Sequence, residues 1–284
     1  MAEKLKQMLW KKILLVGGIL MVALVAGLCV QKPEGIKPTP LQPSEELKLS
    51  DFPEAFKSTL IVVGDNASDI EMQAANEIAD YLENETGNKP LIKKHSEISD
   101  EDKRNYNLIV VGTPKTNPLL EEVYTLTDAT KVTEEFPGEG KGVLEILRSP
   151  WEESKAMLLV EGSDEWGTVI GSITLTDNKE LNEKMFVIKG YKLTLYTTII
   201  TPFHQDRFLT PLEIIVEKTD SEPILFMKQT KDGVVTFILP QGKYECYISP
   251  EESYEKRVNT EVLKIDLKDN MKMELKLRPW GIWR

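Results

Sequence analysis

The stretch Leu60-IVVGDNASDIEMQAANEIADYLENET-Gly87 joins a short apolar run to a long segment with helical periodicity. Its first four residues are apolar and end at a glycine, a pattern typical of a strand that is buried on both faces. Ser68 and Glu71 then form the sequence of a capping box, and Gly87 suits the end of a helix. We therefore predict a buried strand, a polar turn and a helix, in this order.

Two further stretches repeat this arrangement. Residues 108–111 are apolar and lead into a helical segment at 113–124, and residues 157–160 lead through a polar turn into a helical segment at 165–177. Residues 142–151 predict one more strand. Repeated strand–turn–helix units predict an α/β domain with a mostly parallel sheet.

Beyond residue 184 the periodicity changes to the alternation of polar and apolar side chains that strands show. Eight short segments of this type follow one another, separated by turn residues. They are residues 186–189, 191–200, 212–218, 224–229, 234–239, 243–248, 262–268 and 271–277. This series predicts an all-β antiparallel sandwich.

The N-terminal region contains 18 consecutive uncharged apolar residues, Ile13–Val30. At about 1.5 Å per residue they are long enough for a transmembrane helix. Four lysines precede the span and two follow it closely, so we expect a single-pass cell-membrane protein with a cytoplasmic N-terminus and its C-terminal domains outside. A cleaved signal peptide and a buried soluble helix are the alternatives. Candidate helix-packing residues in the span are Gly17, Gly18, Ala23 and Gly27.

Five prolines between residues 31 and 53 predict an extended linker after this span. The chain then divides into six parts. They are a cytoplasmic basic tail (1–12), a transmembrane helix (13–30), a proline-rich linker (31–56), an α/β domain (57–180), a β-sandwich domain (184–279) and an aromatic tail (280–284).

The composition excludes several classes of function. A formal net charge of -11 and a pI near 5.0 argue against a nucleic-acid partner. Two cysteines and two histidines exclude most zinc and iron–sulfur arrangements. The glycine-rich nucleotide motifs, the hydrolase serine motif and the zinc-protease motif do not occur. We therefore expect no enzyme, no cofactor and no metal.

Polar turns follow three of the predicted strands, and in parallel sheets ligands approach the carboxyl ends of strands. The candidate ligand contacts in these turns are Asp65, Asn66, Thr113, Lys115, Asn117, Ser163, Asp164 and Trp166. Side chains of these types also cap helices and turns, and this alternative stays open. Asn66 and Asn84 lie in N-x-[ST] sequences and are candidate N-glycosylation sites.

The α/β segment carries a resemblance to a known group of proteins. The stretches that carry it are residues 60–90, 107–123 and 140–168, with Ser149-Pro150-Trp151 and Gly162-Ser163-Asp164 as their most particular parts. Together, over about residues 57–178, they resemble the α/β domains of archaeal S-layer-like envelope proteins. Residues 60–90 are also similar to the opening of the non-catalytic second domain of some family 20 glycoside hydrolases. The first resemblance implies a cell-envelope protein, and the second implies sugar contact only weakly.

The second half of the chain carries a resemblance of its own. The matching residues are Gly233, Phe237, Leu239, Pro240, Gly242 and Tyr244. They resemble the paired strands of the transthyretin-like or carboxypeptidase-regulatory-like β-sandwich family. This resemblance implies an accessory or adhesive module without catalysis of its own.

These observations favour a membrane-anchored, extracytoplasmic envelope protein that acts as a non-catalytic structural or interaction module. Its expected partners are the lipid bilayer, a protein of the envelope or of a membrane complex, and a glycan. The alternative is a carbohydrate-binding or accessory subunit of a larger membrane complex. Exposed, coplanar tryptophans would favour sugar stacking, whereas buried ones would indicate packing. The residues that decide this are Trp151, Trp166, Trp280 and Trp283.

Overall fold

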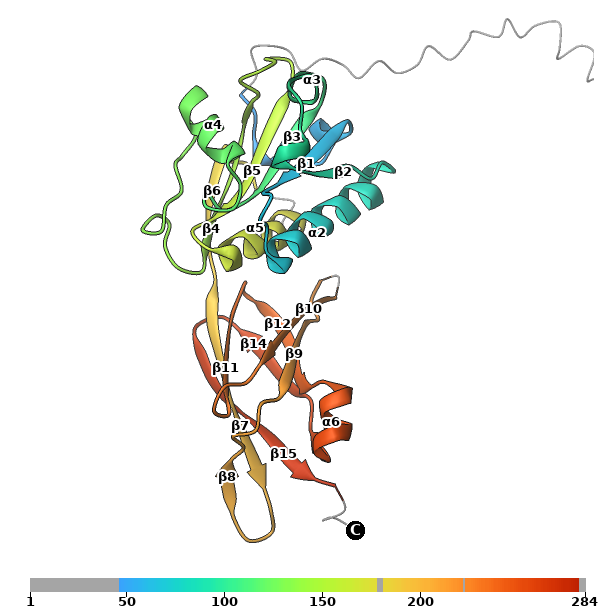
Figure 1. The fold of residues 1–284 in the computed structure, drawn as a ribbon, viewed down its shortest axis with the longest axis vertical. Helices are drawn as coiled ribbons and strands as arrows, with labels where there is room; N and C mark the ends of the chain where they lie inside the picture. The colour runs from blue at the N-terminus through green and yellow to red at the C-terminus, as the bar shows by residue number, and fades with distance from the viewer. Residues whose placement is uncertain (1–45, 178–180, 222, 281–284) are drawn as a thin grey trace, which may run out of the picture. The chain divides into compact units, whose positions relative to one another are not determined.

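The computed structural model describes residues 46–177, 181–221 and 223–280, all of which belong to one compact unit. Their secondary structure forms three β-sheets with helices packed against them (Figure 1). The first sheet is built by the residues before Gly190, and the other two form a sandwich after it.

The first sheet has the strand order β2-β1-β3-β5-β4-β6. Its strands are β1 (Thr59–Val63), β2 (Leu91–Lys94), β3 (Asn107–Gly112), β4 (Lys141–Arg148), β5 (Ala156–Gly162) and β6 (Met185–Lys189). Its helices are α2 (Asp69–Thr86), α3 (Asp100–Asn105), α4 (Leu119–Leu126) and α5 (Glu165–Asp177), with short 3₁₀ turns η1 (Leu49–Asp51), η2 (Glu54–Phe56) and η3 (His95–Glu97).

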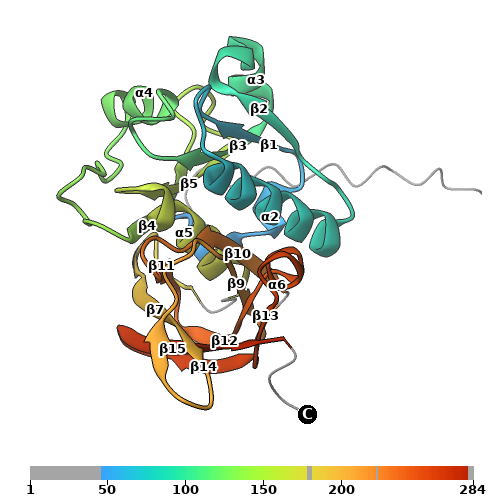
Figure 2. The ribbon, with the colours of Figure 1, turned by 60° about the horizontal axis from the view of Figure 1, so that its bottom comes forward.

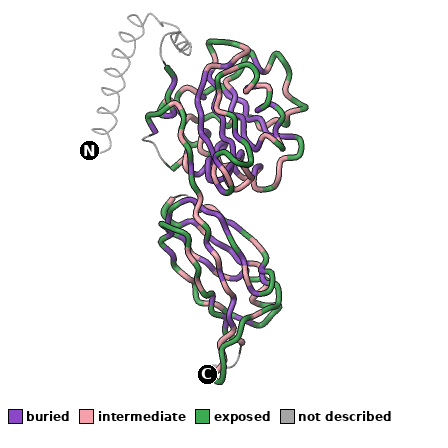
Figure 3. The backbone as a smooth tube through the Cα atoms, turned by 90° about the vertical axis from the view of Figure 1, so that its left-hand side faces the viewer, coloured by how far each residue is buried: buried purple, intermediate pink, exposed green. Residues whose placement is uncertain are grey.

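The helices cover both faces of this sheet. Leu119, Leu120 and Val123 of α4 pack against alternate strand residues such as Leu60 and Val110. Helices α2 and α5 lie side by side over the opposite face (Figures 1 and 2). The central strands are therefore buried on both sides, as their continuous apolar runs predict (Figure 3).

Helix α2 begins and ends where the sequence predicts. The Ser68 hydroxyl accepts the backbone N–H of Glu71 at 3.2 Å, and the Glu71 carboxylate accepts that of Ser68 at 2.9 Å. Gly87 closes the helix at a φ of +75°, a left-handed conformation that glycine adopts without strain. The predicted capping box is confirmed.

Three glycines allow α5 to touch the sheet backbone to backbone. A Cβ atom on Gly167 of α5 would lie 2.0 Å from the carbonyl oxygen of Lys141 at the start of β4. A Cβ on Gly142 would lie 2.4 Å from the Gly167 carbonyl oxygen, and one on Gly162 would lie 2.4 Å from the N–H of Thr168. Any side chain at these positions would push α5 away from β4 and β5.

Two sheets form the second half of the described chain. Their orders are β10-β9-β12-β14 and β11-β7-β15-β13, and β8 also pairs with β7. The strands are β7 (Tyr191–Ile200), β8 (Gln205–Arg207), β9 (Glu213–Lys218), β10 (Ile224–Gln229), β11 (Val234–Leu239), β12 (Gly242–Ile248), β13 (Val258–Thr260), β14 (Leu263–Leu267) and β15 (Met271–Pro279), and helix α6 spans Pro250–Lys256. Phe237, Leu239 and Tyr244 are buried in the core.

The predicted fold class is wrong in several respects. The first sheet is mixed, because β4 and β6 are antiparallel to their neighbours. Only residues 149–155 connect β4 to β5, too few for the crossover that parallel strands need. The sandwich is not all-β and antiparallel either, since β15 pairs in parallel with β7 and α6 packs beside β13. The strand that we predicted to open the sandwich, β6, belongs to the first sheet.

The predicted transmembrane helix also requires correction. Residues 13–30, with Gly17, Gly18, Ala23 and Gly27, lie outside the described residues. Among the helices that the structure does describe, none combines the length and the apolar character needed to cross a bilayer. The predicted transmembrane helix and the single-pass membrane localisation are therefore not supported.

Replacing Gly167 by alanine tests the close contact of α5 with β4. Within a free helix this change is stabilising by about 1 kcal/mol. Here the added Cβ meets the Lys141 carbonyl, so Gly167→Ala should instead lower the free energy of unfolding by about 1–3 kcal/mol in urea denaturation. Gly171→Ala is the control, because its nearest neighbours are side-chain atoms at 3.2 Å or more. Equal effects of the two changes would contradict the role of Gly167.

Candidate functional site

The turns that follow β1 and β3 are held together by two buried side chains. The Asn117 amide donates to the backbone carbonyls of Val62 at 3.0 Å and Val111 at 2.9 Å. The Glu71 carboxylate accepts the backbone N–H of Thr113 at 3.0 Å. Asn117 and Glu71 are both fully buried. Asn117, which we predicted as a ligand contact, therefore joins two strand ends, and the backbone N–H of Thr113, another predicted contact, is bound to the first turn of α2.

The turn after β5 is also engaged within the protein. The Ser163 hydroxyl accepts the backbone N–H of Gly138 at 2.9 Å. The Asp164 carboxylate accepts the N–H of Gly140 at 2.8 Å with one oxygen and that of Gly167 at 2.8 Å with the other. These two residues fasten the segment before β4 to the first turn of α5.

Trp166 does not provide a free aromatic platform. Its ring centroid lies 6.5 Å from that of Phe226, and the Lys228 ammonium lies 3.8 Å from the centroid of the indole. Burial lowers the pKa of Lys228, although Glu165 and Asp164 act in the opposite direction. Side chains of β10 therefore cover the indole that we predicted to contact a ligand.

The remaining predicted residues lie at the surface. Lys115 forms an exposed ion pair with Glu134. Asn66 and Asn84 are both exposed, as glycosylated asparagines must be. Asp65 is exposed as well, and it is the one predicted residue that belongs to a larger cluster of charged side chains.

This cluster lies where β1 and β2 end. His95 Nδ1 lies 3.9 Å from Asp65 Oδ2, and His95 Nε2 lies 3.4 Å from Glu122 Oε1. The Lys103 ammonium lies 2.6 Å from Glu122 Oε2 and 4.8 Å from the ring centroid of Trp151. The sequence indicated only Asp65, because the other members come from segments whose proximity depends on how the sheet is assembled.

Hydrogen bonds set the charge of this cluster. The hydroxyl and the backbone N–H of Ser96 donate to Asp65 and lower the pKa of its carboxyl. Burial acts to raise the pKa of Glu122, but its bonds with Lys103 and His95 outweigh this and lower it. The His95 ring lies between these two carboxylates. The Ser96 hydroxyl is directed to Asp65, so it does not form a nucleophile–base pair with His95.

A second candidate site is a group of exposed aromatic side chains on the sandwich. Phe203 is 92% exposed, Tyr254 73% and Trp280 44%. Strands β7 and β15 run parallel with Leu277 opposite Ile199, so Trp280 and the turn that contains Phe203 lie at the same end of the sheet. We call Phe203, Tyr254 and Trp280 the aromatic end.

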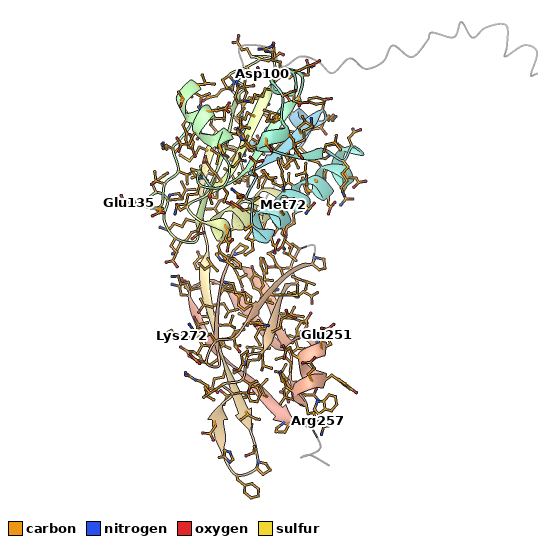
Figure 4. The ribbon with its side chains drawn as sticks, in the orientation of Figure 1. Met72, Asp100, Glu135, Glu251, Arg257 and Lys272 are labelled. Atoms are coloured by element: carbon orange, nitrogen blue, oxygen red, sulfur yellow. The ribbon has the colours of Figure 1, made fainter. Side chains whose placement is uncertain are left out.

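The aromatic end is supported by local contacts. The Tyr254 and Trp280 ring centroids are 5.8 Å apart, with the rings edge to face at 74°. The backbone N–H of Trp280 donates to the carbonyl of Arg257 at 2.8 Å, which places the end of β15 beside α6 (Figure 4). The sequence analysis singled out Trp280, because it opens the aromatic tail at residues 280–284. No sequence pattern indicated that Phe203 or Tyr254 would be exposed beside it.

Exchanging Asn117 for aspartate tests whether its role is structural. The substitution replaces an amide donor by a carboxylate that faces two buried carbonyls, so the free energy of unfolding at pH 7 should fall by more than about 3 kcal/mol. Asn66→Asp is the matched control and should change it by less than about 0.5 kcal/mol. Chemical denaturation of both variants checks this, and similar values for the two would show that Asn117 does not join the strands.

Comparisons with known proteins do not assign a family. No family model matches the sequence, and no curated protein matches it. Among solved structures, the chain is similar to a pilus-presented adhesin, Spy0125 (Cpa), at 13% identity and a TM-score of 0.20. A cysteine-to-alanine mutant of the same adhesin gives 12% and 0.18. Each match covers 39% of this chain and 41% of the adhesin chain, so the comparison spans about two fifths of either protein.

Proposed function

We propose that this protein is a structural or interaction module without catalytic machinery of its own, and that it binds a protein partner through the aromatic end. The observation that carries the proposal is the exposure of Phe203, Tyr254 and Trp280 at one end of a sheet. Aromatic side chains are enriched in protein interfaces and provide much of their binding energy.

The state of the predicted ligand contacts in the α/β half also supports a binding site at the aromatic end, because those contacts are already engaged within the protein. The side chains of Asn117, Ser163 and Asp164 are hydrogen-bonded to the backbone of neighbouring segments, and the Thr113 hydroxyl accepts the backbone N–H of Thr116 in its own turn. Their polar groups would have to give up these bonds before they could contact a ligand. The aromatic end involves no such exchange, because burying an exposed aromatic side chain is favourable by about 1.5–3 kcal/mol.

Sugar stacking is the alternative function, and the tryptophans favour it less. Trp151 and Trp166 are half-buried, and a lysine ammonium covers each ring. Trp280 is exposed, but Tyr254 meets it edge to face at 74°, so the two rings do not form one flat surface. Trp283 lies outside the described residues. A protein partner can use rings at any angle, whereas a sugar face requires an accessible flat ring.

Serine substitutions at Phe203, Tyr254 and Trp280 test the proposal. The triple variant should keep the wild-type free energy of unfolding to within about 1 kcal/mol, because exposed surface positions contribute little to stability. The tagged chain is purified from native cells, and the bound proteins are quantified by mass spectrometry. The triple variant should retain less partner than the wild type, by a factor of about ten or more.

The matched control carries serine at three other exposed apolar positions, Leu91, Leu126 and Val262. It should retain as much partner as the wild type. Equal retention by the aromatic variant, or an equal loss in the control, would contradict binding through the aromatic end. Release of the bound material by free oligosaccharide would instead favour the carbohydrate-binding alternative.

A further inference from the structure

Glu161, near the end of β5, is a fully buried residue, and only one of its two carboxyl oxygens has a hydrogen-bond partner among the described residues. One carboxyl oxygen accepts the hydroxyl of Tyr124 from α4. The other oxygen, Oε1, is buried and has no hydrogen-bond partner among the residues that the structure describes. A buried carboxylate left without partners is costly, whereas the protonated acid carries no charge to solvate.

A second buried carboxylate lies on the same face of the sheet. Val143 of β4 is the register partner of Glu161, and Glu145 projects from the same face two residues further on. Glu145 is 3% exposed, and its Oε2 accepts the backbone N–H of Thr130 at 2.8 Å. Ionisation of Glu161 would therefore place a second negative charge in an interior that already holds one.

The cations near this pair contact groups other than Glu161. The Lys184 ammonium lies 3.8 Å from Glu145 and 3.5 Å from Asp128. The Lys131 ammonium lies over the Tyr124 ring at 5.5 Å and pairs with Glu121 at 2.8 Å. Within the described part of the chain, no lysine, arginine or histidine reaches salt-bridge distance of Glu161.

Tyr124 and Glu145 also hold the segment that covers these acids. The Tyr124 hydroxyl, which donates to Glu161, accepts the backbone N–H of Val132 at 3.3 Å. Val132 is 1% exposed, and the Thr130 N–H is bound by Glu145. Residues 127–140, between α4 and β4, are thus tied to the sheet through the two buried acids.

We propose that Glu161 and Tyr124 form a proton-controlled latch on residues 127–140. When Glu161 carries a proton, the segment is held against the sheet by the chain of bonds from Glu161 through Tyr124 to Val132. Loss of the proton strengthens the bond that Tyr124 donates, but it also leaves a buried charge that Glu145 repels and that draws water towards the orphaned oxygen, and this larger cost opens the segment. This inference is independent of the aromatic end.

The direction of the pH dependence follows from the burial of Glu161. Burial raises the pKa of its carboxyl to about 8, Tyr124 opposes this through its hydrogen bond, and the charge of Glu145 adds to the rise. The folded protein therefore holds this proton more tightly than the unfolded chain does. The contribution of Glu161 to the free energy of unfolding should therefore fall as the pH rises from about 4.5 to about 8. Above this range its contribution should no longer change with pH.

Hydrogen exchange of the intact protein, followed by mass spectrometry between pH 6 and pH 9.5 and corrected for intrinsic rates, tests the latch. In the wild type, protection of residues 127–133 should fall at least about tenfold between pH 7 and pH 9.5. In Glu161→Gln the group cannot ionise, so protection there should not depend on pH. In Tyr124→Phe the bond to Val132 is absent, so the segment should be open at every pH.

Glu77→Gln is the control for a change elsewhere in the molecule. Burial raises the pKa of Glu77 to about 7. This carboxyl accepts hydrogen bonds from the Ser172 hydroxyl and the Gln73 amide on the other face of the sheet. Its variant should lose part of the global pH dependence and keep the wild-type opening of residues 127–133. Two results would overturn the latch. One is that protection of residues 127–133 does not change with pH in the wild type, and the other is that Glu161→Gln loses this protection with rising pH as much as the wild type does.

Discussion

The direct contact of α5 with β4 and β5 is the constraint on which the rest of this structure depends. It exists because Gly142, Gly162 and Gly167 bring backbone to backbone. The same helix borders the passage from β6 to β7, where the N–H of Gly190 donates to the Gly140 carbonyl at 2.8 Å. A Cβ on Gly190 would lie 2.4 Å from a side-chain atom of Ile170 in α5. The position of α5 therefore determines both the edge of the first sheet and the path of the chain into the sandwich.

The sequence predicted the elements of this fold better than their pairing. Local chemistry defines α2 completely, because the Ser68–Glu71 capping box and Gly87 lie within the segment itself. The direction of β4 depends on the short connection at residues 149–155, and the parallel pairing of β7 with β15 joins segments more than 70 residues apart. Strand β2 and helix α3 were missed, since the LIKK sequence of β2 has two lysines and its residues are mostly accessible at the sheet edge.

The candidate site illustrates the same limit. Turn residues such as Thr113 and Ser163 can be found from sequence, but whether they are free depends on the side-chain and backbone groups that come to lie beside them. Glu161 falls within an apolar strand and looks like the first polar residue of a turn, yet the register places it in the interior. Phe203 is apolar and so resembles a core residue, and only the turn between β7 and β8 exposes it. Each of these outcomes is decided by tertiary structure.

The two halves of the sequence differ in charge, and this difference bears on the proposed binding of a partner at the aromatic end. Residues 46–190 contain 29 acidic and 15 basic side chains, whereas residues 191–284 contain 14 of each. An acidic surface repels the many proteins and polymers that are also negatively charged, and this repulsion extends over about 8–10 Å at moderate salt. The sandwich imposes no comparable penalty, and it carries the aromatic end. A partner of either sign can therefore reach Phe203, Tyr254 and Trp280 without first overcoming the charge that the α/β half presents.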